Sequence, residues 1–127
     1  MSGLAEQVAQ AARLIAHAGL VGPFGQVSAR GPEGGFLLTP DMPLLHVQAQ
    51  DVIELDTAAR VSGGKKAVSP VEAPLHAAIY ADCHDVGAIC RTHSPAAVVW
   101  ASRGEVPPLV HGLGGRSEEH TSELQSQ

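Results

Sequence analysis

The stretch that decides the fold runs from Ser69 to His93, SPVEAPLHAAIYADCHDVGAICRTH. Its first four residues, SPVE, have the pattern of a capping box with proline at the first helical position. We therefore expect a helix that starts here and continues to about Asp82. The apolar run from Val86 to Cys90 then predicts a buried strand. The stretch thus places the start of a helix and the end of a strand close together in the chain.

Four side chains at these two element ends form the candidate site. Glu72 and His76 stand four residues apart and share one face of the predicted helix. Arg91 and His93 stand two residues apart and would point to the same side of a strand. A carboxylate, two imidazoles and a guanidinium are therefore expected to converge where the strand end meets the helix start.

The rest of the chain predicts a mixture of helices and strands. Apolar residues recur at helical spacing from Leu4 to Ile15, and Gly19 is expected to end that helix. Strands are expected at 27–29, 36–39 and 52–56, the last one forming a hairpin with the residues from Arg60 onward. Residues 40–50 have the composition of a partly buried loop, and a further helix is expected from Pro95 to about Ser102.

Composition and charge exclude several classes of function. The 127 residues carry a formal net charge of −5 and no basic cluster, which argues against a nucleic-acid partner. No apolar run reaches the eighteen or so residues that a membrane-spanning helix needs, and the N-terminus has no signal-peptide pattern. Cys83 and Cys90 lack metal-ligand spacing, so we expect reduced thiols in a cytoplasmic protein.

Five segments together resemble the N-terminal part of the class II aldolase/adducin family, which includes fuculose-phosphate aldolases. They are AARLIAHAGLVGPFGQVSAR, FLLTP, DVIELD, VEAPLHAAIY and DVGAICRTHSPAA, in the family's order and spacing over about residues 8 to 113. The resemblance implies an α/β fold, a three-layer α/β/α sandwich around a largely antiparallel sheet. It also implies a homo-oligomer, a tetramer in most relatives, that acts on a small-molecule substrate.

The resemblance also assigns roles to residues. It implies a divalent metal, zinc in most relatives and manganese or magnesium as alternatives, held by a His-x-His pair and a third histidine. His93 falls on the second histidine of the pair, and Glu72 falls on the glutamate that handles protons. Gly25 and Gln26 fall where a glycine and an asparagine contact the substrate phosphate.

Two departures from the family pattern affect the chemistry. Arg91 replaces the first histidine, and a guanidinium keeps its charge and cannot bind a metal at neutral pH. The third histidine would lie beyond Gln127, which leaves His76 or His111 as substitutes by spacing alone. Asp41 stands where relatives hold phosphate with a serine, and its carboxylate would repel that group. Arg91 as a bidentate donor would instead suit a substrate carboxylate.

These residues favour a metal-dependent lyase that cleaves a carbon–carbon bond, decarboxylase-like rather than a sugar-phosphate aldolase. Two alternatives stay open: a sugar-phosphate aldolase, and a non-catalytic association module like adducin. Glu72 has a structural alternative as well, since the third position of a capping box needs a carboxylate or an amide without any catalytic duty.

The last twelve residues, RSEEHTSELQSQ, differ in composition from the rest. They resemble the translation of a sequencing-adapter oligonucleotide, the alternative being an ordinary polar tail. The sequence therefore predicts a truncated domain over residues 1–115, a non-native tail over 116–127 and an inactive fragment.

Overall fold

The computed structural model describes residues 3–21, 25–63 and 69–104. It divides the chain into two units, one up to Ser94 and the other from Pro95 onward. The described elements of the first unit are α1 (Leu4–His17), β1 (Gln26–Arg30), β2 (Phe36–Leu38), η1 (Leu44–His46), η2 (Ala49–Asp51), β3 (Ile53–Leu55), β4 (Val61–Gly63), α2 (Ala73–Asp82) and β5 (Ala88–Arg91). The second unit contributes α3 (Pro95–Ser102).

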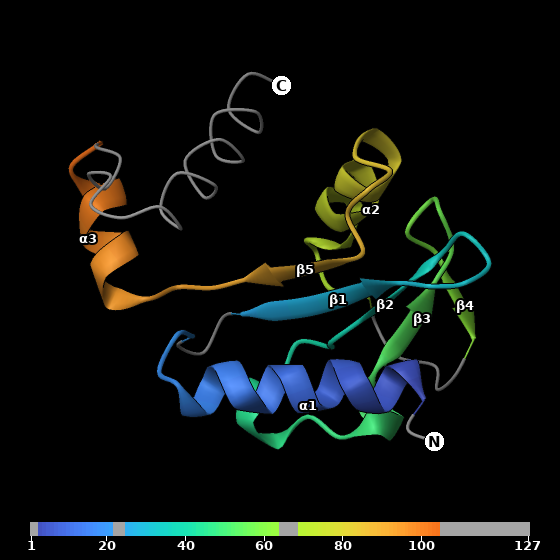
Figure 1. Cartoon of the computed structure of the whole chain (residues 1–127), viewed down its shortest axis with the longest axis horizontal. Coiled ribbons are helices and arrows are strands. Elements are labelled where there is room, and N and C mark those ends of the chain that lie inside the picture. The colour runs from blue at the N-terminus through green and yellow to red at the C-terminus, as the bar shows by residue number, and fades with distance from the viewer. Residues whose placement is uncertain (1–2, 22–24, 64–68, 105–127) are drawn as a thin grey trace. The chain divides into compact units, whose positions relative to one another are not determined.

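The five strands form one sheet in the order β4-β3-β2-β1-β5, and every pairing is antiparallel (Figure 1). Strands β1 to β4 follow one another as a meander, and α2 then returns the chain so that β5 lies beside β1. In this register Ser28 lies opposite Leu38 on one side and Ile89 on the other. Since side chains alternate along a strand, these three residues share one face of the sheet.

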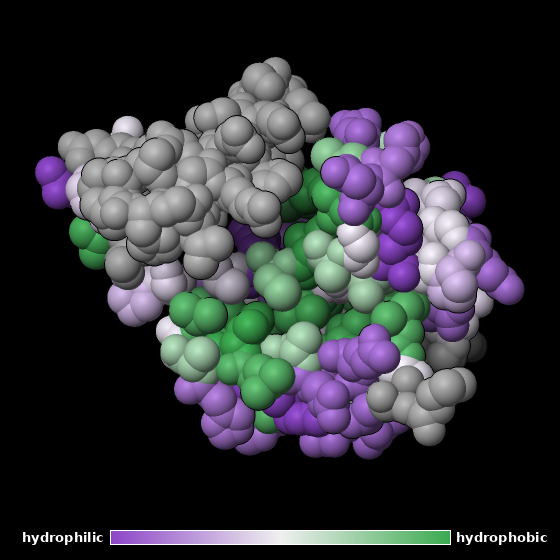
Figure 2. Space-filling view, in the orientation of Figure 1, coloured by the Kyte–Doolittle hydropathy of each residue, from purple (hydrophilic) through white to green (hydrophobic). Residues whose placement is uncertain are grey.

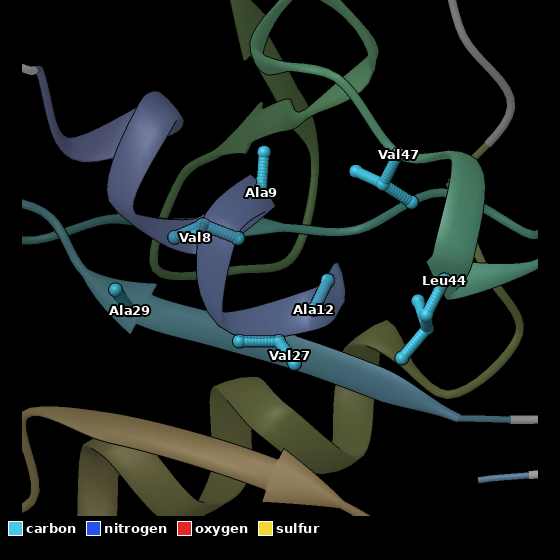
Figure 3. Packing of buried hydrophobic residues seen from close by; sticks show 7 residues of the cluster. All are labelled: Val8, Ala9, Ala12, Val27, Ala29, Leu44 and Val47. Carbon is cyan, nitrogen blue, oxygen red and sulfur yellow. The ribbon is translucent and has the colours of Figure 1, made fainter. Parts of the chain in front are cut away.

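Helix α1 covers the opposite face. Its buried residues Val8, Ala9 and Ala12 pack on Val27 and Ala29 of β1. Leu44 of η1 and Val47, just after η1, complete the cluster (Figure 3). The alanines let the helix backbone approach the strand closely. The helix ends as predicted: Gly19 has a φ of +73°, and the Leu20 amide donates to the Ile15 carbonyl.

The outer surface of α1 is not uniformly polar. Leu14 is 69% exposed and Leu20, just after the helix, is 40% exposed. Apolar surface gathers over this C-terminal half of α1, whereas hydrophilic residues border it below (Figure 2).

Helix α2 packs on the other face of the sheet, which makes three layers. Phe36, Leu38, Ile53 and Leu55 from the strands form a second core with Ala73 and Tyr80 of the helix. The structure therefore confirms the α/β/α sandwich around an antiparallel sheet.

Arg30 at the end of β1 fixes the far end of α2. Its guanidinium donates to the carbonyl oxygens of Tyr80, Cys83 and Val86 at 2.9 to 3.0 Å, and it lies 4.9 Å from the centre of the Tyr80 ring. A cation here is favoured by the negative C-terminal end of the helix, where Tyr80 and Cys83 present their carbonyl oxygens, while Val86 follows the helix. The helix is therefore held against β1 in a defined position along the strand.

Most predicted elements are present, and two details were wrong. Helix α2 begins at Ala73, not Pro70, so Glu72 is its N-cap residue, and its side chain makes no capping hydrogen bond. The capping-box pattern failed because residues 71 and 72 form a turn instead of the first helical turn. The strand predicted as buried is β5, in which Ala88 and Cys90 are exposed. In the described part of the chain β5 pairs only with β1, so it lies at the sheet edge.

Helix α3 agrees with its predicted bounds and is followed by Gly104 with a φ of +70°. Among the described residues, no helix combines the length and the apolar character needed to cross a membrane.

Gly35 offers a test of how tightly β2 and β3 approach. A β-carbon at this position would overlap the backbone carbonyl oxygen of Leu55, whereas one at Gly87 would meet nothing within 4 Å. We expect Gly35→Ala to lower the free energy of unfolding by about 1–3 kcal/mol, because the strand backbone has to shift. Gly87→Ala is the matched control and should leave stability nearly unchanged. Equal denaturation midpoints for the two variants would contradict the close approach.

Candidate active site

The carboxylate of Glu72 is the centre of the candidate site. Glu72 lies at the start of α2, beside the first residue of β1 and the last residue of β5. The Gln26 amide nitrogen donates to Glu72 Oε2 at 2.8 Å, and Arg91 Nη1 lies 3.2 Å from Glu72 Oε1. The Glu72 and Arg91 side chains are 36% and 39% exposed, so both remain open to a ligand.

These contacts keep Glu72 ionised. Its own backbone amide lowers the pKa of the Glu72 carboxyl most, followed by the hydrogen bond from Gln26 and then by the positive charge of Arg91. Partial burial acts in the opposite direction but is outweighed. At neutral pH Glu72 can therefore accept a proton but has none to give.

His76 lies one helical turn further on and is 1% exposed. Its Nε2 is 3.0 Å from Gln26 Oε1, and its Nδ1 is 2.7 Å from Ser28 Oγ. Burial lowers the pKa of His76 to about 4, with the positive charge of Arg91 acting in the same direction. His76 is thus neutral near pH 7, and both ring nitrogens are engaged. It is not available as the substitute metal ligand that its spacing suggested.

The contacts continue into the core. Ser28 Oγ lies 2.8 Å from the Tyr80 hydroxyl. Burial raises the pKa of the Tyr80 phenol, so the phenol keeps its proton. Phe36 lies against both rings, with centroids 6.4 Å from His76 and 5.4 Å from Tyr80. An unbroken series of polar contacts therefore runs from the half-exposed Arg91 to the buried Tyr80.

An open cavity of about 520 Å³ lies next to Glu72. It is lined by Gly25, Gln26, Asp41, Met42, Pro43, Val71 and Glu72. Gly25 and Gln26, two of the three residues predicted to bind substrate, thus border the same space as the predicted proton-handling carboxylate, whereas the third, Arg91, is not part of this lining. Asp41 adds a second carboxylate to this lining.

His93 lies beyond the end of β5, where its backbone amide donates to the Leu20 carbonyl at 2.8 Å. Its Nε2 is buried and has no hydrogen-bond partner in the described part of the chain. Leaving a buried nitrogen unsatisfied is costly, so an imidazole nitrogen of this kind is suited to binding a ligand. This fits the role of metal ligand that the sequence suggested.

One suitable nitrogen does not make a metal site. No three histidine, cysteine, aspartate or glutamate side chains come together around a possible ion within 3–21, 25–63 and 69–104. Arg91 occupies the place of the first expected histidine and pairs with Glu72. His111 lies outside the described residues. The described residues alone therefore do not fit a complete zinc site.

Sequence patterns identified part of this arrangement. They brought Glu72, His76 and Arg91 together correctly, although His76 reaches Glu72 through Gln26 rather than directly. They missed Ser28 and Tyr80. The sequence does contain a pattern for each of them. Tyr80 follows His76 by the same four residues that separate His76 from Glu72. Ser28 is a small polar residue between two apolar residues of its strand.

Comparisons with known proteins agree with the fold. Residues 6–121 match the model of the Class II Aldolase and Adducin N-terminal domain. The chain belongs to this family. It is 33% identical over 103 residues to the 5-methylthioribulose-1-phosphate/5-deoxyribulose-1-phosphate aldolase of Rhodospirillum rubrum, covering 80% of this chain and 45% of that protein.

Solved structures of the class II aldolase family resemble this chain as well. The L-fuculose 1-phosphate aldolase of Glaciozyma antarctica superposes with a TM-score of 0.73 at 28% identity, covering 84% of this chain and 45% of that one. A second L-fuculose 1-phosphate aldolase gives a TM-score of 0.77 at 22% identity, covering 87% and 54%, which supports the fold alone. The chain thus spans about half the length of these relatives.

Proposed function

We propose that the whole protein to which this chain belongs is a carbon–carbon lyase in which Glu72 accepts a proton from a substrate hydroxyl and then returns it to the carbon that the broken bond leaves. The observation that carries this proposal is the ionised, half-exposed Glu72 carboxylate at the edge of the 520 Å³ cavity, held by Gln26 and Arg91. A general base must be deprotonated, fixed and accessible, and Glu72 meets these three conditions. Its side chain makes no capping bond, so the structural alternative has lost its support.

Arg91 is the proposed anchor for a substrate carboxylate. Its guanidinium has five N–H donors, and only Nη1 contacts Glu72. Other donors can therefore bind a ligand. A bound carboxylate would also compete with Glu72 for Arg91. That competition would remove one of the influences that lower the pKa of Glu72 and would make it a better base when substrate is present.

A sugar-phosphate aldolase is the second candidate. The Rhodospirillum rubrum relative and the fuculose-phosphate aldolases favour it by likeness. Against it, Asp41 lines the cavity together with Glu72, and two carboxylates disfavour a phosphate dianion there. We therefore rank a small carboxylate, in a decarboxylase-like reaction, above a sugar phosphate.

Substitutions of Arg91 separate the two candidates. Arg91→Lys keeps the charge but loses the planar fork, and we expect it to raise KM for a carboxylated substrate about tenfold with little change in kcat. Arg91→His restores the family's His-x-His pair. Steady-state kinetics of both variants, with carboxylate and with sugar-phosphate substrates, would measure these changes in KM and kcat. If Arg91→His gained sugar-phosphate cleavage while Arg91→Lys left carboxylate turnover untouched, the aldolase would replace the decarboxylase-like enzyme.

A divalent metal, with zinc as the first choice, belongs to the proposal for the whole protein, with His93 as one ligand. When bound, such an ion polarises a substrate oxygen. The remaining ligands would have to come from outside the described residues. Association as a homo-oligomer is proposed on the same ground, by likeness to the family.

The 127-residue chain is accordingly expected to bind zinc poorly. Losing two of three ligands should remove several kcal/mol of the roughly 10–16 kcal/mol typical of structural zinc sites. Isothermal titration with zinc would measure the affinity, and His93→Ala is the control. Sub-micromolar binding that His93→Ala abolishes would contradict this expectation.

A further inference from the structure

Four hydrogen bonds link Glu72 to Tyr80 through Gln26, His76 and Ser28, and they all have the same donor-to-acceptor direction. An ionised carboxylate only accepts hydrogen bonds, so the Gln26 amide must turn its NH₂ group toward Glu72 Oε2. The Gln26 oxygen then faces His76 Nε2, 3.0 Å away, and can only accept. His76 Nε2 must therefore carry the ring proton.

The same argument gives the donor and the acceptor of each hydrogen bond among His76, Ser28 and Tyr80. A neutral imidazole with its proton on Nε2 has a bare Nδ1, so the Ser28 hydroxyl donates to it at 2.7 Å. Ser28 Oγ in turn accepts the proton of the Tyr80 hydroxyl at 2.8 Å. Every donor from Tyr80 onward points toward Glu72. A protonated Glu72 would reverse this order, because its own O–H would donate to Gln26.

We infer that His76 is a positioning residue for Glu72: acting through Gln26, it fixes Oε2 and holds the carboxylate in the orientation in which Oε1 meets Arg91. This inference rests on the proposed function of Glu72. Gln26 has no proton that it can release near neutral pH, so the four residues orient Glu72 and do not conduct protons to it. Gln26 therefore positions the base in addition to lining the cavity.

Burial explains why the imidazole suits this task. His76, Ser28 and Gln26 are 1%, 0% and 5% exposed, so water does not compete for their hydrogen bonds. Phe36 lies nearly parallel to the His76 ring, with 13° between the planes, and limits its rotation. A rigid ring with two nitrogens on opposite sides connects the core to the half-exposed site.

The first test needs no activity. Imidazole ¹⁵N shifts of the 127-residue chain at neutral pH should show His76 as a single tautomer with the proton on Nε2. In Glu72→Gln the acceptor-only group is gone, and the tautomer with the proton on Nδ1 should become detectable. Glu54→Gln, at an exposed position of β3, is the matched control and should leave His76 unchanged. A proton on Nδ1 in the unsubstituted chain, or a tautomer that Glu72→Gln does not alter, would overturn the inference.

The second test uses the whole protein and two variants that both remove the ring. In His76→Gln the longer amide can place a donor where Nε2 was, whereas His76→Asn reaches only the place of Nδ1. We expect His76→Asn to lower kcat about 10- to 100-fold, the loss typical of a hydrogen bond to a charged group. His76→Gln should recover most of that loss, with KM similar in both. Equal kcat values in two variants of equal stability would reduce His76 to a structural role.

The two tests also separate this inference from the proposed function. If the whole protein proved inactive as a lyase, the tautomer of His76 would still show whether the hydrogen bonds from Tyr80 to Glu72 all donate toward Glu72. If the tautomer were wrong while Glu72→Gln still abolished activity, the proposed function would stand without the positioning role.

Discussion

Glu72→Gln is expected to lower kcat of the whole protein about 10²- to 10⁴-fold, the usual contribution of a general base. Glutamine has the same shape, can still accept a hydrogen bond from Gln26, and removes only the charge and the ability to take up a proton. Because the Glu72 side chain makes no capping bond, the helix should start unchanged.

The measurement is steady-state kinetics combined with circular dichroism. Glu54→Gln removes a carboxylate from an exposed position of the same sheet and should keep full activity. If kcat of Glu72→Gln lay within about twofold of that of the unsubstituted protein, Glu72 would not be the general base, because loss of a general base lowers the rate far more than twofold.

Acid should destabilise the fold through His76. Its pKa is lowered from 6.5 to about 4 in the folded chain, so between these values the unfolded chain binds more protons than the folded one. Stability is therefore complete above pH 6.5 and falls as the pH drops toward 4. The loss should be on the order of 3 kcal/mol at pH 4.

Urea denaturation from pH 7 to pH 4.5 checks this. His76→Gln should flatten the pH dependence, although it lowers stability overall. His17→Gln, at an exposed position near the end of α1, should keep the slope of the unsubstituted chain. Identical slopes for the unsubstituted chain and His76→Gln would place the acid sensitivity elsewhere.

Local patterns predicted the strands and helices well because each element has a clear period. Apolar spacing located α1, alternation located β3, and the run from Phe36 located β2. The start of α2 was missed by three residues, since SPVE satisfies a capping pattern that the turn before the helix overrides. Burial of β5 could not be judged from its composition, because an edge position depends on which strands lie beside it.

The candidate site was only partly predictable for the same reason. Glu72, His76 and Arg91 come from one stretch, and spacing within it brought them together. Gln26 and Ser28 come from a strand nearly fifty residues earlier, and only the pairing of β1 with β5 brings them to α2. A local pattern can mark Ser28 as a polar residue between apolar ones, but it does not contain the strand pairing that brings Ser28 to α2. That Nε2 of His93 has no hydrogen-bond partner among the described residues also emerges only once its surroundings are known.

The contacts between α2 and β1 depend on a coincidence of two periods. Residues 72, 76 and 80 recur every four positions, about 6 Å along a helix, and residues 26, 28 and 30 recur every two, about 6.6 Å along a strand. Over two repeats the mismatch is only about 1 Å, so side chains of the two elements stay in step. Insertion of one residue into either element would put the helix and the strand out of phase and would separate Glu72 from Gln26. Natural variation in this region should therefore consist of substitutions, with insertions confined to the loops on either side.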